Sequence, residues 1–185
     1  QDAAAAAPQA AAAGATPVAT ASGAGAGEIV SSPMTGELVS LDDVPDTTFS
    51  QRLVGDGTAI RPTSGEVTSP IDGTVVTVFP TKHAVGLLSD SGVEVLIHVG
   101  LDTVALKGAG FTAHVAAGDR VAVGDRLLDV DLEAVGRTND TVSVVVVTNS
   151  AGYTIDPGTT GPVRAGDALI RVTPAATLTS EGVSA

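Results

Sequence analysis

From residue 28 onward, short runs rich in β-branched residues alternate with turn-forming residues such as Ser69-Pro70 and Asp72-Gly73. Short runs at this spacing predict strands of an all-β sandwich or barrel. No 11-residue window keeps an apolar stripe of helical period, so we expect helices of one turn at most, the best candidate being 132–136. The predicted strands, roughly ten in number, are 28–30, 36–41, 65–68, 74–79, 85–88, 93–99, 111–115, 126–131, 142–148 and 169–172.

Several of these runs repeat along the chain. Residues 32–39 resemble residues 69–76, which lie 37 positions later. Three further segments, 115–119, 121–125 and 163–167, each run from Val into a Gly-Asp turn. Glycine there supplies a positive φ and aspartate caps the turn. Repeated hairpins of this kind favour an antiparallel β-sandwich with a duplicated hairpin motif.

The two ends of the chain differ from its centre in composition. Residues 1–27 contain 14 alanines and a single charge, Asp2, so we expect a disordered Ala/Gly/Pro-rich linker. A linker, and a first residue that is Gln1 rather than Met, favour an upstream domain. Residues 174–185 are small and polar and predict a flexible C-terminal tail. The folded domain is therefore expected over 28–173.

Composition and charge exclude several functions. Aromatic residues make up 2% of the chain and the net charge is −12, which argues against a nucleic-acid partner and favours a basic protein partner. The absence of cysteine excludes disulfides and thiolate chemistry, and fits a cytoplasmic protein. The longest apolar run, 144–147, is strand-sized, and no signal peptide precedes it, so we expect no membrane insertion.

The chain has three histidines, His83, His98 and His114. In the run 93–99, strand alternation points Val95 toward the core and His98 to a mixed opposite face. His83 lies in a turn before the preceding strand. Two adjacent strands could bring both rings together, although each ring could equally be a structural residue satisfied by its neighbours.

A pair of histidines suits phosphoryl transfer. Neutral imidazole is a nucleophile near neutral pH, and a carbonyl that holds Nδ1–H leaves Nε2 free to attack phosphorus. A second ring can donate a hydrogen bond to the phosphoryl oxygens. Phosphoryl transfer depends mostly on positioning and charge stabilisation, so few residues suffice.

Several motifs, in order along the chain, together match one known protein family. They include Thr81-Lys82-His83-Ala84 and His98-Val99-Gly100-Leu101-Asp102. With these segments the chain resembles the glucose-type IIA domain of the bacterial sugar phosphotransferase system, in register from about 28 to 173. The matching segments are 44–49, 54–63, 81–84, 89–94, 98–104 and 106–108.

The resemblance implies a phosphoryl carrier in sugar uptake, without a cofactor. His98 would accept a phosphoryl group on Nε2 from the histidine-containing phosphocarrier protein HPr and pass it to a cysteine of a IIB domain. His83 would assist, Thr81 would hydrogen-bond within the site, and the Gly100 carbonyl would fix the His98 tautomer. The linker would allow fusion to IIB or IIC domains, which would tether the domain to the inner face of the plasma membrane.

The resemblance also implies a shallow apolar depression that receives the partners. We expect it to be lined by Phe49, Val85, Leu96 and Val104. Two rim acids, Asp46 and Asp102, would meet arginines of the partners. At the position of Val85 the family usually has an aromatic residue, and at the positions of Leu88 and Ala105 it often has an acid. The rim of this chain is therefore less aromatic and less acidic than the rim expected for the family.

Two other functions compete with this interpretation. A zinc peptidase on a related β-motif would use His98 with His83 or Asp102, but needs a later His-x-His pair, and only His114 follows. Two imidazoles at His83 and His98 would still leave open positions for adventitious zinc. A biotinyl or lipoyl carrier fits the hairpin rhythm of 115–131 but needs a lysine at a hairpin tip; Lys82 and Lys107 have the wrong neighbours.

Overall fold

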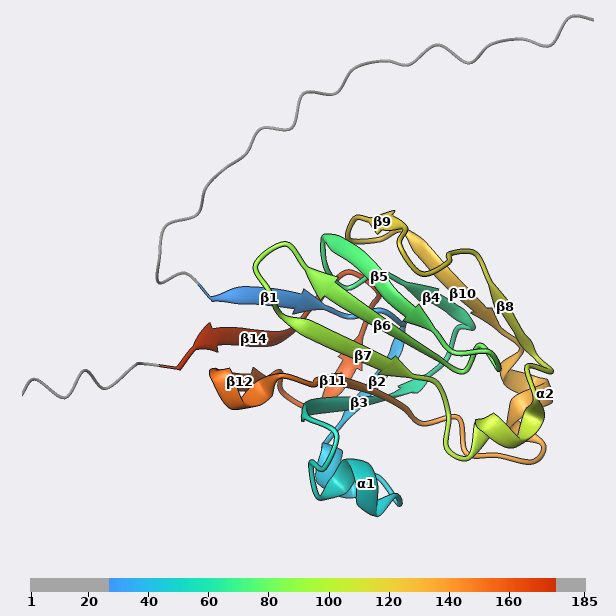
Figure 1. Cartoon of the computed structure of the whole chain (residues 1–185). Coiled ribbons are helices and arrows are strands. Elements are labelled where there is room, and N and C mark those ends of the chain that lie inside the picture. Colours follow the sequence, from blue (N-terminus) through green and yellow to red (C-terminus); the bar gives the residue numbers. More distant parts are fainter. Residues whose placement is uncertain (1–26, 176–185) are drawn as a thin grey trace, which may run out of the picture.

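The computed structural model describes residues 27–175, which form an all-β domain with only short helices (Figure 1). Within that range we find no helix long and apolar enough to cross a membrane. The strands are β1 (Glu28–Ser31), β2 (Gly36–Val39), β3 (Asp56–Pro62), β4 (Glu66–Thr68), β5 (Gly73–Val78), β6 (Ala84–Ser89), β7 (Glu94–His98), β8 (Phe111–Ala113), β9 (Arg120–Val121), β10 (Arg126–Val130), β11 (Ser143–Val147), β12 (Tyr153–Pro157), β13 (Gly161–Val163) and β14 (Ala168–Pro174). The helices are η1 (Leu41–Asp43), α1 (Thr47–Ser50), η2 (Thr103–Leu106), α2 (Leu132–Gly136) and η3 (Ser150–Gly152).

The strands form one large sheet and two small ones, all antiparallel. The large sheet has the order β13-β2-β3-β11-β7-β6-β5-β9, and the small sheets have the orders β1-β14-β12 and β4-β10-β8. The main core contains residues from all three sheets, as expected for a sandwich. The predicted antiparallel β-sandwich is confirmed.

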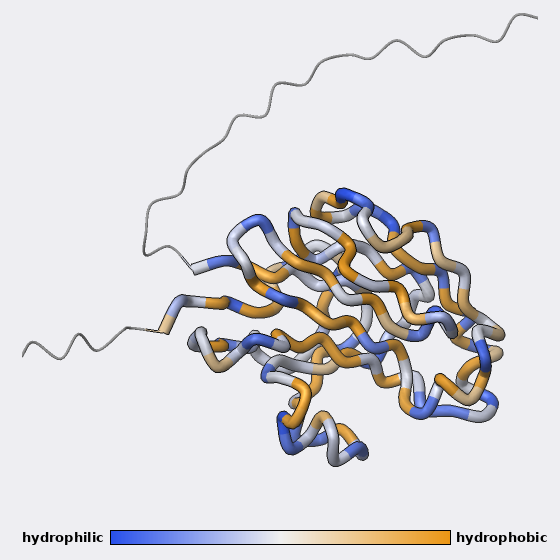
Figure 2. The backbone as a smooth tube through the Cα atoms, in the orientation of Figure 1, coloured by the Kyte–Doolittle hydropathy of each residue, from blue (hydrophilic) through white to orange (hydrophobic). Residues whose placement is uncertain are grey.

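Hydrophobic residues follow one another along the central strands of the large sheet (Figure 2), and they pack into apolar clusters on both of its faces. On β11, Val145 and Val147 point into the main core, whereas Val144 and Val146 point to the opposite face. Successive side chains of a strand alternate between faces, so covering both faces buries the whole run 144–147. The second face is covered by η1 and α1, which contribute apolar side chains to a smaller core (Figure 1).

The predicted repeat is visible in the hydrogen bonds. The Ser32 N–H donates to the Asp167 carbonyl and the Ser69 N–H donates to the Asp125 carbonyl, each at 2.7 Å. In each case the acceptor lies in a Gly-Asp turn whose aspartate carboxylate accepts a backbone N–H three residues earlier. The same turn recurs at Asp119. The two copies of the motif therefore share the same backbone hydrogen bond to a Gly-Asp turn as well as a similar sequence.

The structure contains four strands outside the predicted ranges, β3, β9, β12 and β13. β3 and β12 were not expected, because Gly55-Asp56-Gly57 and Asp156-Pro157-Gly158 have turn composition. Pro174, expected in the tail, is the last residue of β14 and pairs with Tyr153. The predicted helical turn at 132–136 is confirmed as α2. Residues 176–185 of the tail and residues 1–26 of the linker lie outside the described residues.

Candidate functional site

Adjacent strands of the large sheet bring two histidines together. Ala84, the first residue of β6, pairs with His98 at the end of β7, so His83 lies beside that end. The Val99 N–H donates to the His83 carbonyl at 2.7 Å and joins the two backbones. The imidazole centroids are 4.9 Å apart, with the rings nearly perpendicular at 77°. The predicted alternation on β7 is confirmed, since Val95 and Ile97 are buried in the core and His98 is partly exposed on the other face.

One nitrogen of His98 has a defined partner. Its Nδ1 lies 2.9 Å from the Gly100 carbonyl oxygen. A carbonyl can only accept, so neutral His98 carries its proton on Nδ1 and its lone pair on Nε2. The Phe49 ring from α1 packs against the imidazole with centroids 5.0 Å apart. Together these contacts fix both the tautomer and the orientation of the ring.

His83 is held by the turn that connects β5 and β6. The Phe79 N–H donates to the Ala84 carbonyl at 3.0 Å, and the Lys82 N–H donates to the Phe79 carbonyl at 2.7 Å. This turn places the Thr81 hydroxyl 2.5 Å from Nδ1 of His83. It also brings the Phe79 ring edge-on to the His83 imidazole, with centroids 5.4 Å apart. His83 is thereby nearly buried, with 6% of its surface exposed.

Burial keeps both imidazoles in the neutral form. It lowers the pKa of His98, although the Gly100 carbonyl and the charges of Asp46 and Asp102 act in the opposite direction. Burial also lowers the pKa of His83, and the charge of His98 lowers it further. At neutral pH two uncharged rings therefore face each other, one with a free Nε2 lone pair.

Most of the residues expected around the depression lie on the His98 face of the sheet or on helices beside it. Leu96 shares the face of His98 on β7, and Phe49 contacts the ring. Asp46 is the N-cap of α1, where its carboxylate accepts the Thr48 N–H at 2.8 Å. Asp102 precedes η2 in a left-handed conformation, φ 55°.

One of the expected docking residues lies elsewhere. Val85 pairs with Ile97, and both side chains point into the main core, where Val85 is fully buried. Because Val85 and His98 are on opposite faces of the sheet, Val85 cannot line a depression beside the ring. The prediction for Val85 is wrong. Val104 on η2, by contrast, is exposed over 55% of its surface.

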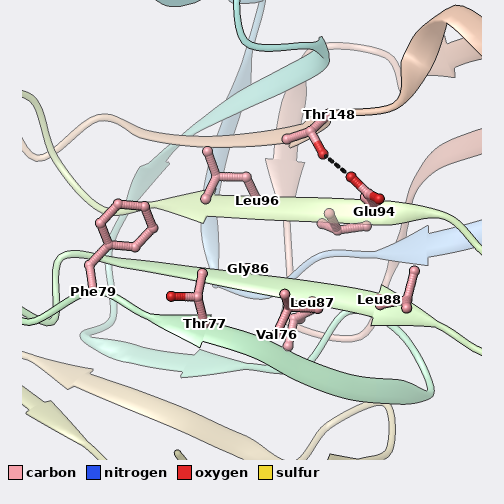
Figure 3. Close-up of a pocket in the computed structure, with 10 residues that line it drawn as sticks. Val76, Thr77, Phe79, Gly86, Leu87, Leu88, Glu94, Leu96 and Thr148 are labelled. Carbon is pink, nitrogen blue, oxygen red and sulfur yellow. Dashed lines mark hydrogen bonds between the residues drawn. The ribbon is translucent and has the colours of Figure 1, made fainter. Parts of the chain in front are cut away.

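An apolar groove, not predicted from the sequence, runs along the His98 face of β5, β6 and β7 (Figure 3). It has a volume of about 390 Å³. Phe79 and Leu96 line the end nearest the histidines, while Thr148 donates to Glu94 at 3.1 Å farther along. Phe79 could have been suspected, as an aromatic residue four positions before His83. The groove is lined by Val76, Thr77, Phe79, Gly86, Leu87, Leu88, Glu94, Val95, Leu96 and Thr148.

The third histidine belongs to a different surface. His114 follows β8, and its Nε2 pairs with the Asp129 carboxylate of β10 at 2.7 Å. Among residues 27–175, no group of three or more histidines and acids is arranged to hold a metal ion. Lys82 lies in the β5–β6 turn and Lys107 follows η2.

Comparison with known proteins assigns this β-sandwich to a class of phosphoryl carrier. The family profile of the phosphoenolpyruvate-dependent sugar phosphotransferase system, EIIA 1, matches residues 28–153, and the chain belongs to this family. The domain is thus a phosphoryl-carrying component of sugar uptake, and EIIA components work with HPr and IIB. Neither a zinc peptidase nor a biotinyl or lipoyl carrier is favoured.

One relative matches the chain in sequence, and a solved structure matches it in fold. The chain is 55% identical over 121 residues to the "PTS system glucose-specific EIIA component" of Halalkalibacterium halodurans, covering 65% of this chain and 70% of the relative. It also resembles the solved "glucose permease IIA" from Mycoplasma capricolum, with a TM-score of 0.74 and 40% identity. That match covers 78% of this chain and 95% of the other. The resemblance to a glucose-type IIA domain is confirmed.

Proposed function

We propose that this domain carries its phosphoryl group on Nε2 of His98, taking it from phosphorylated HPr and passing it to a cysteine of a IIB domain. The observation that supports this most directly is the 2.9 Å contact between His98 Nδ1 and the Gly100 carbonyl. That contact keeps the proton on Nδ1 and leaves Nε2 as the only ring nitrogen with an available lone pair.

In this reaction the Nε2 lone pair forms a bond to phosphorus while the bond from phosphorus to the donor nitrogen breaks. The donor nitrogen leaves with the bonding electron pair. The proton on Nδ1 of His98 stays in place, so the phosphorylated ring becomes positively charged. The Gly100 carbonyl stabilises that charge because its oxygen already accepts the Nδ1–H.

His83 is suited to assist rather than to accept. When the Thr81 hydroxyl donates to Nδ1 of His83, the imidazole carries its proton on Nε2. A ring in that state, perpendicular to His98 at 4.9 Å, can donate Nε2–H to a phosphoryl oxygen. Such a donor stabilises charge that develops in the transition state without forming the bond itself.

The apolar surface around the histidines suits a partner protein. Phe79 and Leu88, which line the groove, each expose 38% of their surface, and Val104 on η2 exposes 55%. Asp46 and Asp102, which influence the pKa of His98, provide acidic groups for arginines of HPr and IIB. We place the domain in the cytoplasm with these partners, and residues 1–27 as a linker to a fused IIB or IIC domain.

Three single substitutions test the proposal. With phosphorylated HPr as the donor, His98→Gln should abolish the mass increase of one phosphoryl group, because glutamine has no nucleophilic nitrogen. His83→Gln should still accept the group, while transfer to a IIB cysteine slows by about 10²–10³. His114→Gln is the matched control and should behave as the unsubstituted domain. Retained phosphorylation of His98→Gln would contradict the proposal.

A further inference from the structure

The backbone that follows His98 has a partner for every polar group from Val99 to Leu101. The Val99 N–H donates to His83 and its carbonyl accepts the Thr103 hydroxyl, both at 2.7 Å. The Gly100 carbonyl accepts the Nδ1–H of His98. The Gly100 N–H and the N–H and carbonyl of Leu101 remain, and all three form hydrogen bonds with one segment distant in sequence.

That segment is 139–143, which runs from the loop after α2 to the first residue of β11. The Ser143 hydroxyl oxygen accepts the Gly100 N–H at 3.3 Å. The Asp140 carbonyl accepts the Leu101 N–H at 2.9 Å, and the Asn139 side-chain amide donates to the Leu101 carbonyl at 3.0 Å. These residues lie about 40 positions from the loop they hold, and nothing in the His98 motif points to them.

The segment is itself fixed. The Ser143 hydroxyl donates to the Thr141 carbonyl at 3.0 Å, so its hydrogen is committed and its lone pairs face the Gly100 N–H. Ser143 is fully buried. The Val142 N–H donates to the Asp140 carboxylate at 2.9 Å, and the Thr138 hydroxyl donates to the Asn139 side-chain oxygen at 2.7 Å. Both side chains that reach the loop therefore have one orientation.

These bonds act on the peptide group that His98 uses. The Gly100–Leu101 peptide accepts the Nδ1–H at its carbonyl oxygen and donates its N–H to the Asp140 carbonyl. Hydrogen bonds at both ends of one peptide polarise each other and strengthen the acceptor. The peptide cannot rotate without losing both bonds, together with those from Ser143 and Asn139 on either side.

We propose that Asn139 and Ser143 are positioning residues for phosphoryl acceptance. They hold the loop after β7 so that the Gly100 carbonyl stays aimed at Nδ1 of His98 and the lone pair stays on Nε2. Neither side chain touches the incoming phosphoryl group. The catalytic consequence rests on the proposed function of His98, whereas the effect on the tautomer does not.

The test uses Ser143→Ala, Asn139→Ala and their combination. The matched control is Ser69→Ala, which removes another buried hydroxyl that donates to a carbonyl, that of Ile71 at 2.8 Å, outside the histidine site. The readout is the pair of side-chain ¹⁵N shifts of His98 in the unphosphorylated full chain at a pH where the ring is neutral. These shifts report which nitrogen carries the proton.

We expect the unsubstituted domain and Ser69→Ala to show a single Nδ1–H tautomer. Ser143→Ala and Asn139→Ala should show averaged shifts from both tautomers, and their phosphorylation by HPr should slow by up to about tenfold each. An unchanged tautomer together with an unchanged rate, in variants that lose only stability, would overturn the proposal. If Ser143→Ala fails to fold, Asn139→Ala, whose side chain is only half-buried, carries the same test.

The two proposals fail in different ways. Phosphorylation of His98→Gln would overturn the role of His98 as the acceptor. The ¹⁵N shifts need no phosphoryl donor, so a change of tautomer in Asn139→Ala would still support the positioning of the ring. An unchanged tautomer would reject that positioning whatever the phosphorylation site.

Discussion

The two histidines are neighbours in space but are held by opposite kinds of partner. His98 has a backbone carbonyl, that of Gly100, two residues after it, and His83 has a hydroxyl, that of Thr81, two residues before it. A carbonyl oxygen only accepts a hydrogen bond, whereas a hydroxyl both donates and accepts. His98 is therefore restricted to one tautomer, while His83 can take either as the Thr81 hydroxyl rotates.

Under the proposed function, this difference suits the two similar side chains to different tasks. A nucleophile needs its lone pair on one nitrogen before the donor arrives, and His98 meets that need. A group that stabilises developing charge must hold a proton on the nitrogen that faces the phosphoryl group. The Thr81 hydroxyl allows His83 to carry its proton on either nitrogen. Under that proposal the two roles differ because Nδ1 has a carbonyl partner in His98 and a hydroxyl partner in His83.

Gly100→Ala is the substitution that breaks the His98 side most severely. Gly100 has a φ of +71°, and a Cβ there would lie 2.5 Å from Thr103 Cγ2 and 2.9 Å from the Asp140 carbonyl oxygen. The loop must move, and the Gly100 carbonyl moves with it. We expect phosphorylation by HPr to slow roughly 100-fold or more, because small displacements of reacting groups cost about this much. A rapid-quench assay measures the rate.

Gly118→Ala separates backbone strain from crowding. Gly118 also has a positive φ, +98°, but a Cβ there meets nothing within 4 Å. It should cost about 1–2 kcal/mol in urea unfolding and leave phosphorylation unchanged. Gly100→Ala should cost about 1–3 kcal/mol more. Equal losses of stability in the two variants would contradict the crowding described for Gly100.

Thr81→Val breaks the His83 side with a smaller effect. The change removes the hydroxyl but nearly keeps the shape, so Nδ1 of His83 loses its partner. Acceptance by His98 should continue, while transfer to a IIB cysteine slows by up to about tenfold, the effect of one hydrogen bond. Pre-steady-state measurement of each half-reaction distinguishes the two. A slower acceptance with unchanged onward transfer would reverse the roles assigned here.

The pH dependence of stability sharpens the comparison without changing the reaction. The pKa of each of the two histidines is lowered from its ordinary value of 6.5, so below that pH the unfolded chain binds more protons than the folded domain. The free energy of unfolding should therefore be highest above pH 6.5 and fall as the pH drops below it. In denaturant titrations, the free energy of unfolding of the double variant His83→Gln/His98→Gln should fall less over the same drop in pH. An equal fall in this variant would contradict the burial of the two rings.

A second pH window lies lower and has a different cause. Hydrogen bonds from Arg52 and Arg120 lower the pKa of Asp42 and Asp90 respectively. The stability that these carboxylates contribute is present above about 3.8 and is lost below it. The two windows are separate, because the histidine contribution begins to fall below pH 6.5 and the aspartate contribution only below about 3.8.

Local sequence was sufficient to predict most of the sandwich. β6, β7 and β10 follow from alternation and flanking turns, and the Gly-Asp repeats follow from the conformational needs of glycine. β3 was missed because Gly57 has turn character when considered alone. In the fold a Cβ at Gly57 would lie 2.1 Å from the Val145 carbonyl oxygen, so this glycine permits the close approach of β3 to β11. Such a requirement appears only when the partner strand is known.

The site could be predicted in part for the same reason. His83, His98, Thr81 and Gly100 lie in two short motifs, so the sequence and the family resemblance were enough to nominate them. Val85 was misplaced because its face depends on the register of β6 against β7, which the sequence does not state. Asn139 and Ser143 could not be nominated at all, since they reach the site only through the pairing of β11 with β7.

Identification of the phosphorylated nitrogen tests the central claim most directly. The domain, labelled with ¹⁵N in its histidine side chains, is phosphorylated by HPr and examined by NMR for coupling between ³¹P and ¹⁵N. We expect one-bond coupling to Nε2 of His98 alone, with Nδ1 still carrying its proton toward Gly100. Coupling to Nδ1 of His98, or to either nitrogen of His83, would contradict the account.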